Sequence, residues 1–448
     1  MAHIPQTSLF DWEDDIENLG DLERLRCVLR VLPDEKLMRT LEAERGNGRD
    51  DYPVRPVWNS ILAGIVFQHP TVESLRRELQ RNGQLRYVCG FDMGRGAFDV
   101  VPTPRAYTEF LQNLYGHQEM IDEMFGRLVE ALREELPDFG RHLAADSKAI
   151  QSHARRQNTD GDEELERDGR RDVDADVGVK TYRGRREDGT LWEKTRSWFG
   201  YKLHLIVDAD YELPVAYEVT RASRPDNKPA ARLVDDLEEA CRKVIEDCEA
   251  LAADRGYDDG KLLEKLWRGK GIKPVVDIRD GWKDGEDTRR VPGTRNVVYD
   301  CEGTVYCWGM KTGKVRQMDY WGYEKGRDCQ KWRCPAAVHG RKCPDAGRCG
   351  SAGDYGKVVR IKRSVDPRVF TPIARPSLKF ERLYSKRTAV ERVNGRLDTS
   401  FGFEDHCIRG QAKMRLRCSL ALVVMLAMAL GRVREKRKDR MRSLVRAA

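Results

Sequence analysis

Two short apolar runs, each ended by an aspartate, place the strongest constraint on the fold of this chain. Residues 143–145 lead to Asp146 and residues 250–253 lead to Asp254, with only leucine and alanine in either run. Short apolar runs of this kind are typical of buried strands. A mixed sheet with Asp146 on a central strand and Asp254 at the end of its neighbour would bring the two carboxylates together, so the runs predict an α/β fold.

A third carboxylate lies in a C-terminal stretch that is typical of a helix. Tyr384, Arg387 and Glu391 are spaced by three and four residues, which puts them on one helical face. Two strand-end carboxylates and one on a helix are the parts of an Mg²⁺ or Mn²⁺ site for phosphoryl transfer. Taken singly, each aspartate also fits a surface or capping role, and Tyr384 and Arg387 also fit simple packing and an ion pair.

The stretches around these carboxylates predict a mixed sheet flanked by helices. Strands are expected at 199–208, 213–220, 250–254 and 272–278, and helices at 228–241 and 258–267. Residues 151–186, by contrast, are highly charged and almost free of apolar side chains. Such a composition cannot bury a core, so it predicts a long surface loop or a disordered arm.

Three segments together resemble a known family. The segment from Tyr384 to Leu397 resembles the signature of insertion-sequence DDE transposases, whose third acidic residue lies in a tyrosine, arginine, glutamate, lysine pattern. Residues 254–258 resemble the second acidic motif of that family, and residues 200–208 resemble its second strand. The resemblance runs from about residue 52 to about residue 430. The chain departs from it where the family lysine falls on Asp398, and Arg396 is a possible substitute.

The resemblance implies a ribonuclease-H-like catalytic domain over 141–278 and 373–430, with Asp146, Asp254 and Glu391 catalytic. The expected activity is that of a DNA transposase that binds the terminal inverted repeats of its own element. It would cut and join DNA with water and then the freed 3′ hydroxyl as nucleophiles. A transposase-derived DNA-binding protein without catalysis and a nuclease of the same fold without strand transfer are the alternatives. The expected DNA contacts near the site are Tyr384, Arg387, Arg396 and Lys202, with His204 beside Lys202 on a strand face that fits solvent equally well.

Basic side chains further along the chain suggest other places where DNA would bind. Residues 52–135 predict a helical DNA-binding domain in which Thr71 and Thr103 cap two helices. Residues 1–51 form an acidic lead-in, in which residues 1–50 hold twelve acids against seven bases. Residues 431–448 form a basic tail, with eight bases against two acids. An ordinary solvated face or helix end is the alternative for each basic group. The arginines that carry the prediction for the helical domain are Arg76, Arg77 and Arg81.

Half of the twelve cysteines fall in residues 279–372, which we expect to form an insertion in the catalytic domain. Polar insertions of this size lack a core, and a metal would supply one, so the cluster predicts zinc with His339 nearby. Unliganded thiols and an iron–sulfur centre are the alternatives. The six cysteines are Cys301, Cys307, Cys329, Cys334, Cys343 and Cys349.

The N-terminal residues do not resemble a signal peptide. The longest apolar run, 419–430, is shorter than a membrane span and is typical of a buried helix. We therefore expect a cytoplasmic protein that associates with the nucleoid. Its net charge of +7 permits binding to double-stranded DNA, and the expected assembly on DNA is a homodimer.

Overall fold

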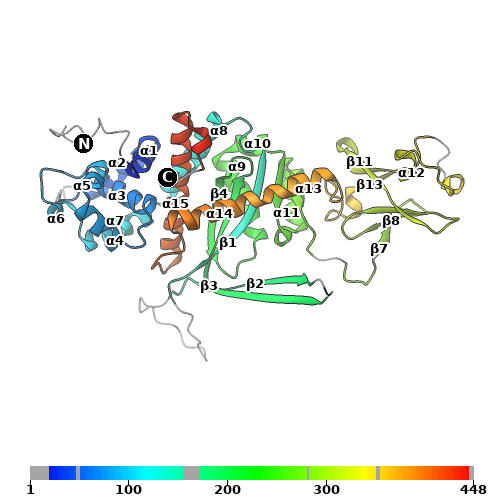
Figure 1. The fold of residues 1–448 in the computed structure, drawn as a ribbon, viewed down its shortest axis with the longest axis horizontal. Coiled ribbons are helices and arrows are strands. Elements are labelled where there is room, and N and C mark those ends of the chain that lie inside the picture. The colour runs from blue at the N-terminus through cyan, green and yellow to red at the C-terminus, as the bar shows by residue number, and fades with distance from the viewer. Residues whose placement is uncertain are drawn as a thin grey trace, which may run out of the picture.

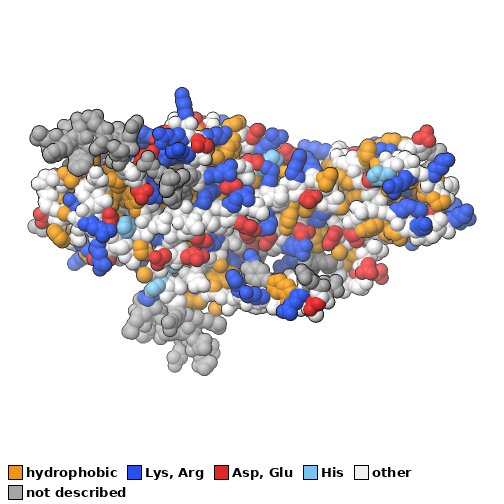
Figure 2. Space-filling model, viewed as in Figure 1, with side chains coloured by type: hydrophobic (Ala, Val, Ile, Leu, Met, Phe, Trp, Pro, Cys, Tyr) orange, Lys and Arg blue, Asp and Glu red, His pale blue; other side chains and the backbone are white. Residues whose placement is uncertain are grey.

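The structure is a computed structural model that describes residues 20–46, 51–154, 172–186, 188, 190–279, 282–349 and 354–442. The described chain is elongated (Figure 1): helices from the N-terminal part lie at one end, a large sheet with its helices lies in the middle, and small sheets lie at the other end. Basic and acidic side chains lie next to one another over much of the face in Figure 2.

The central sheet mixes parallel and antiparallel strands. Strand β1 pairs antiparallel with β3 and parallel with β5, β6 extends the sheet parallel to β5, and β4 pairs antiparallel with β3. Across the sheet the order is therefore β4-β3-β1-β5-β6, and the predicted α/β class is confirmed. The strands are β1 (His142–Gln151), β3 (Leu191–Asp208), β4 (Leu213–Arg221), β5 (Ala250–Ala253) and β6 (Lys273–Val276).

A long hairpin extends from this sheet where the sequence predicted only loop or disorder. Strand β2 (Asp176–Arg185) pairs antiparallel with the first half of β3, and the two project beyond the other strands (Figure 1). The prediction for 151–186 was therefore wrong for residues 176–185, while residues 155–171 lie outside the described residues. The strand needs no core of its own, because ladder hydrogen bonds and cross-strand pairs to β3 hold it.

Helices pack on both faces of the sheet. On one face, Ala250 and Ala252 of β5 pack against Phe380 and Leu383, and the helical segment that carries these two continues across β1 and β3. On the other face, α9 packs on β3 and β4. The segment across the first face consists of α13 (Leu378–Tyr384), the single turn η7 (Ser385–Arg387) and α14 (Thr388–Phe401); α9 is Asn227–Ala240, α10 Arg242–Asp247 and α11 Gly260–Glu264.

The N-terminal helices share one core with the central sheet. Thr71 and Thr103 cap α4 and α7 as predicted, each by accepting a backbone N–H. Helix α1 packs against α15 near the other end of the chain. The helices are α1 (Leu22–Val31), α2 (Glu35–Arg45), α3 (Val54–Val66), α4 (Val72–Arg81), α5 (Gly83–Cys89), α6 (Ala97–Val100), α7 (Pro104–Gly116), α8 (Gln118–Glu135) and α15 (Gln411–Arg434).

Helix α15 is the core helix of the middle part. It packs against α8, α1, α3 and β4, and every residue from Ser419 to Leu430 is buried, which confirms the predicted buried helix. In the described part of the chain it is the single helix long and apolar enough to cross a membrane. That is weak evidence for a span, because 89% of its most apolar window is buried inside the protein.

The described residues of 282–372 form two small antiparallel sheets with a core of their own, so the expectation that this insertion lacks a core was wrong. One sheet has the order β10-β9-β8-β7 and the other β11-β12-β13. Val297, Trp332, Val359 and Phe370 are among the residues of their shared core. The elements are β7 (Thr288–Arg290), β8 (Val297–Asp300), β9 (Val305–Trp308), β10 (Val315–Gln317), β11 (Asp319–Glu324), β12 (Cys329–Arg333), α12 (Pro335–Val338) and β13 (Val358–Lys362).

Candidate active site

Asp146 and Asp254 lie side by side on neighbouring parallel strands. The register of β1 and β5 pairs Ala144 with Ala252 and Ala145 with Ala253. The next residue along the first strand is Asp146, and the residue that follows the second strand is Asp254. Because side chains alternate along a strand, both aspartates share the face of Ala252, which is the face covered by α13 and α14. Asp254 Oδ1 accepts a hydrogen bond from the Gly256 backbone N–H at 2.7 Å.

The pKa of Asp146 reflects several charged side chains that lie near it. Burial and, after it, the negative charge of Asp254 raise the pKa of Asp146 to about 6, although Lys180 and Arg387 act in the opposite direction. A cation between two neighbouring carboxylates stabilises their charged forms. The donor set of this pair, two half-buried carboxylates, is the kind that Mg²⁺ prefers.

The helical segment brings the third carboxylate to the same face. Arg387 Nη1 lies 2.8 Å from Glu391 Oε1, and the Arg387 guanidinium also interacts with Asp146. Tyr384 stacks on Phe380 with 5.6 Å between ring centroids. Glu391 is half exposed, with 53% of its side chain accessible. Arg387 thus stands between the strand carboxylates and Glu391, and it pairs with Glu391.

Within the described residues, no three Asp, Glu, His or Cys side chains are gathered closely enough to hold a metal ion as they stand. The structure brings Asp146 and Asp254 together and places Glu391 on the helix above them, paired with Arg387. Glu391 has to exchange its contact with Arg387 for a metal to be bound by all three carboxylates. Half-exposed and free to rotate at its terminus, it is the member of the set that can move most readily.

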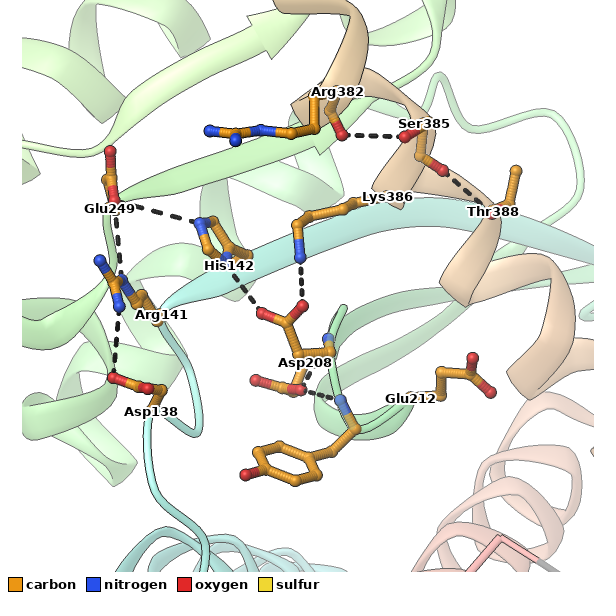
Figure 3. A network of polar contacts seen from close by, with 12 residues as sticks. Asp138, Arg141, His142, Asp208, Glu212, Glu249, Arg382, Ser385, Lys386 and Thr388 are labelled. Atoms are coloured by element: carbon orange, nitrogen blue, oxygen red, sulfur yellow. Dashed lines mark hydrogen bonds and ion pairs between the residues drawn. The ribbon is translucent and has the colours of Figure 1, made fainter. Parts of the chain in front are cut away.

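A polar network fixes the turn η7 on the sheet (Figure 3). Lys386 of η7 donates to Asp210 in the turn between β3 and β4, and His142 at the start of β1 contacts the same carboxylate, 2.8 Å away. Asp208, beside it, accepts backbone N–H groups of Gly140 and Asp210. Because Lys386 precedes Arg387, these contacts set the position from which Arg387 and Glu391 reach the site.

Two residues that sequence reasoning missed also lie close to the aspartates. Burial raises the pKa of Tyr257 well above its usual value, and the charges of Asp146, Asp226 and Asp254 add to that rise. Lys180 of β2 acts electrostatically on Asp146, so the projecting hairpin reaches toward the site. Tyr257 lies within the motif that follows Asp254 in the sequence. Nothing in the sequence, in contrast, indicated that Lys180 lies near the site, because its segment lacked the pattern of a strand.

The other predicted DNA contacts near the site lie away from this face. Lys202 donates to Asp226 at 2.9 Å, and His204 is buried and hydrogen-bonded to Thr220 at 2.9 Å, so His204 has no surface to offer DNA. Burial lowers the pKa of His204 to about 4. The Arg396 guanidinium donates to the backbone carbonyl of Glu212 and is mostly buried, so the structure does not bring it to the carboxylates.

The three arginines of α4 differ in their surroundings. Arg76 donates to the backbone carbonyl of Pro102 at 2.7 Å and is largely covered. Arg77 and Arg81 keep 76% and 78% of their side chains exposed. Arg77 and Arg81 therefore remain open to a DNA phosphate, whereas Arg76 supports the fold of the helical domain.

The six cysteines of the insertion separate into four and two. Cys307, Cys334, Cys343 and Cys349 line one cavity. Burial and, after it, the other three thiols of this set raise the pKa of Cys307 to about 11. Cys301 and Cys329 instead have acidic neighbours, which are Asp300 and Glu302 for the first and Glu324 for the second.

Comparison with known proteins gives one finding that bears on this geometry. The model of the family described as "Transposase DDE domain" matches residues 137–427. The match begins just before β1, ends within α15 and contains all three carboxylates. A search of the curated proteins finds no match.

Proposed function

Because this chain belongs to the DDE transposase family, we propose that it binds the terminal inverted repeats of its own mobile element and catalyses DNA strand cleavage and strand transfer. The observation that carries the proposal is the register of β1 and β5, which sets Asp146 beside Asp254 under the helix of Glu391. Phosphodiester chemistry with divalent metals needs carboxylates grouped in this way.

The fold supports the same assignment. The strand order β4-β3-β1-β5-β6, with β3 antiparallel to β1 and the last two strands parallel to it, is the order expected of a ribonuclease-H-like sheet. On this interpretation β1 is the first and central strand, β3 and β4 are the second and third, and β5 and β6 complete the sheet. The carboxylates then occupy the end of the sheet at which parallel strands β1 and β5 deliver their side chains together.

Asp146, Asp254 and Glu391 would hold Mg²⁺ or Mn²⁺. The bound metal would activate the attacking oxygen and stabilise the leaving oxygen of the phosphodiester. Arg387 has two roles in this proposal: in the absence of DNA it neutralises Glu391, and with DNA bound it turns to a phosphate and frees Glu391. Tyr384, one turn earlier on the same segment, would contact the phosphate or sugar of the same strand.

The path that we propose for DNA follows from the cations around the site. Lys180 on the hairpin and Arg387 on η7 approach Asp146 from two different elements, so a strand lying over the carboxylates would pass between them. Arg77 and Arg81 on α4 would bind DNA further along, away from the chemistry. A homodimer on paired element ends remains our expectation for the assembly.

A strand-transfer assay with the DNA that flanks the coding region tests the proposal. Purified protein, Mg²⁺ and a labelled element end should give cleavage at the end and joining to a target duplex. Cleavage without joining would favour a nuclease of the same fold, and end binding without cleavage would favour a DNA-binding protein derived from a transposase. Either outcome would overturn the proposal of strand transfer.

A further inference from the structure

Four thiols converge from separate parts of the small β region. Cys307 lies on β9, Cys334 follows β12 directly, and Cys343 and Cys349 lie in the segment after α12. All four line a single cavity of about 390 Å³. They are free thiols, and each is partly exposed rather than sealed in an apolar core. Zinc sites with four cysteine ligands use this number and kind of donor.

The other potential ligands of the region are engaged elsewhere. Cys329 Sγ lies 3.9 Å from Glu324 Oε2, and Cys301 lies beside Asp300 and Glu302. His339, which the sequence placed near the cluster, contacts Asp319 at 3.2 Å and does not line the cavity. Of the six cysteines and His339, four thiols therefore share one cavity, and the other three side chains lie outside it.

Polar contacts around the four thiols hold in place the segments that carry them. Asn296 Nδ2 lies 4.0 Å from Cys349 Sγ, and Lys357 holds the other end of that amide at 2.6 Å. Asp345, between the last two cysteines, accepts hydrogen bonds from the backbone N–H groups of Lys311 and Thr312. These contacts tie the segment that bears Cys343 and Cys349 to the β9–β10 hairpin. Polar groups that orient metal ligands in this way are typical of zinc sites.

We propose that Cys307, Cys334, Cys343 and Cys349 bind one zinc ion as a four-thiolate site that joins the two small sheets. Cys307 belongs to the β10-β9-β8-β7 sheet and Cys334 to the end of the β11-β12-β13 sheet, so one ion would cross-link both. Since the described residues do not already hold three ligands at metal distance, binding draws the four sulfurs inward to about 2.3 Å from the ion. The site is independent of the magnesium chemistry proposed above.

The test is metal analysis of the full-length protein purified without chelator, together with single Cys→Ser variants. Wild-type protein should contain about one zinc per chain, as expected for one tetrahedral site. Cys307→Ser, Cys334→Ser, Cys343→Ser and Cys349→Ser should each lose most of it. The matched controls are Cys301→Ser and Cys329→Ser, in the same region and outside the cavity, and they should keep the wild-type content.

Two further measurements use the wild-type protein, so they do not depend on whether the serine variants fold. When a thiol-modifying reagent releases zinc from the wild-type protein, four thiols should become reactive for each zinc ion released. Cobalt substitution should give the intense thiolate-to-metal absorption of a tetrahedral sulfur site. Wild-type protein without zinc, or equal loss of zinc in the Cys301 and Cys329 controls, would overturn the assignment.

Discussion

Lys148 Nζ lies 2.7 Å from Asp398 Oδ2, so an ion pair joins β1 to α14 two residues beyond Asp146 and seven beyond Glu391. Lys148 also contacts Glu404 at 3.1 Å, and only 10% of its side chain is exposed. Position 398 is the one at which the resemblance predicted a lysine. A lysine ammonium does lie beside that position, but the strand supplies it and the helix supplies the carboxylate.

An exchange of the two charges tests this relationship. Lys148→Ala and Asp398→Ala should each lower the free energy of unfolding by roughly 1–3 kcal/mol, because each leaves a largely covered charge without its partner. The double variant Lys148→Glu with Asp398→Lys should recover most of the loss and much of the cleavage rate. Urea denaturation and a cleavage assay measure both quantities. A loss in the exchange variant as large as in either alanine variant would show that the two side chains are not coupled.

Replacement of each of the three carboxylates should abolish DNA cleavage and leave DNA binding nearly unchanged. Asp146→Ala, Asp254→Ala and Glu391→Ala should each abolish strand cleavage and leave the binding of element ends nearly unchanged, since DNA affinity comes mainly from phosphate contacts. Glu381→Ala, an exposed carboxylate on α13, is the matched control and should cleave normally. Gel-shift and cleavage assays on the same preparations provide the comparison. Robust cleavage by Glu391→Ala would refute the assignment of the third carboxylate.

The raised pKa of Asp146 predicts how the metal-free protein responds to pH. Because its pKa of about 6 in the folded state lies above the ordinary value of 3.8, the folded state holds the extra proton. Stability from this group is full below about pH 4 and is lost as the pH rises through 6. Asp146→Asn should therefore stabilise the metal-free protein at pH 7.5 by about 1–3 kcal/mol and have little effect near pH 4.

The measurement is thermal unfolding with and without Mg²⁺ at several pH values. Mg²⁺ should stabilise the wild-type protein above pH 6 and progressively less below it, because the ion competes with the proton for Asp146. Asp146→Asn should lose this response. The burial of Asp208 raises its pKa to about 6 as well, so the difference between wild type and variant, not the wild-type curve alone, reports on Asp146. An equal Mg²⁺ response in both proteins would contradict the prediction.

The exposed arginines of α4 are expected to bind DNA without taking part in chemistry. Arg77→Glu combined with Arg81→Glu should weaken the binding of element ends, and the slope of log affinity against log salt should fall by about 0.9 for each phosphate that is no longer neutralised. Lys36→Glu, at an exposed lysine on α2, is the control for one such charge reversal. Fluorescence anisotropy over a salt series gives the slope. Unchanged binding by the double variant would place recognition elsewhere, in the cysteine insertion or the basic tail.

The parts of the fold that sequence predicted are those set by local patterns. Apolar runs placed β5 and located Asp146 and Asp254, and hydroxyl caps placed the starts of α4 and α7. The pairing of β1 with β5, which brings the two aspartates together, was expected from the resemblance to a ribonuclease-H-like element order and not from the apolar runs alone. The 3–4 spacing of Tyr384, Arg387 and Glu391 likewise placed them on one side of a helical segment, although η7 interrupts it.

The features that sequence reasoning missed depend on contacts between distant residues. Strand β2 owes its order to pairing with β3 and not to its own composition, so its residues showed no strand pattern. The partner of Asp398 lies 250 positions away on β1, and neither residue alone indicates the other. The division of the cysteines into four and two depends in the same way on how two small sheets pack, which spacing along the chain does not encode.

The packing of α1 against α15 has a consequence for synthesis of the chain. Cys27 of α1 contacts the Met428 backbone carbonyl, and Arg432 pairs with Glu23, across about four hundred residues. At roughly 5–20 residues per second, a ribosome that has released α1 needs on the order of 20 to 80 seconds to produce its partner. Until then the apolar side of α1 has no cover from α15. A chain that ended before α15 would lack that cover, and one that ended before residue 391 would also lack the third carboxylate of the proposed site.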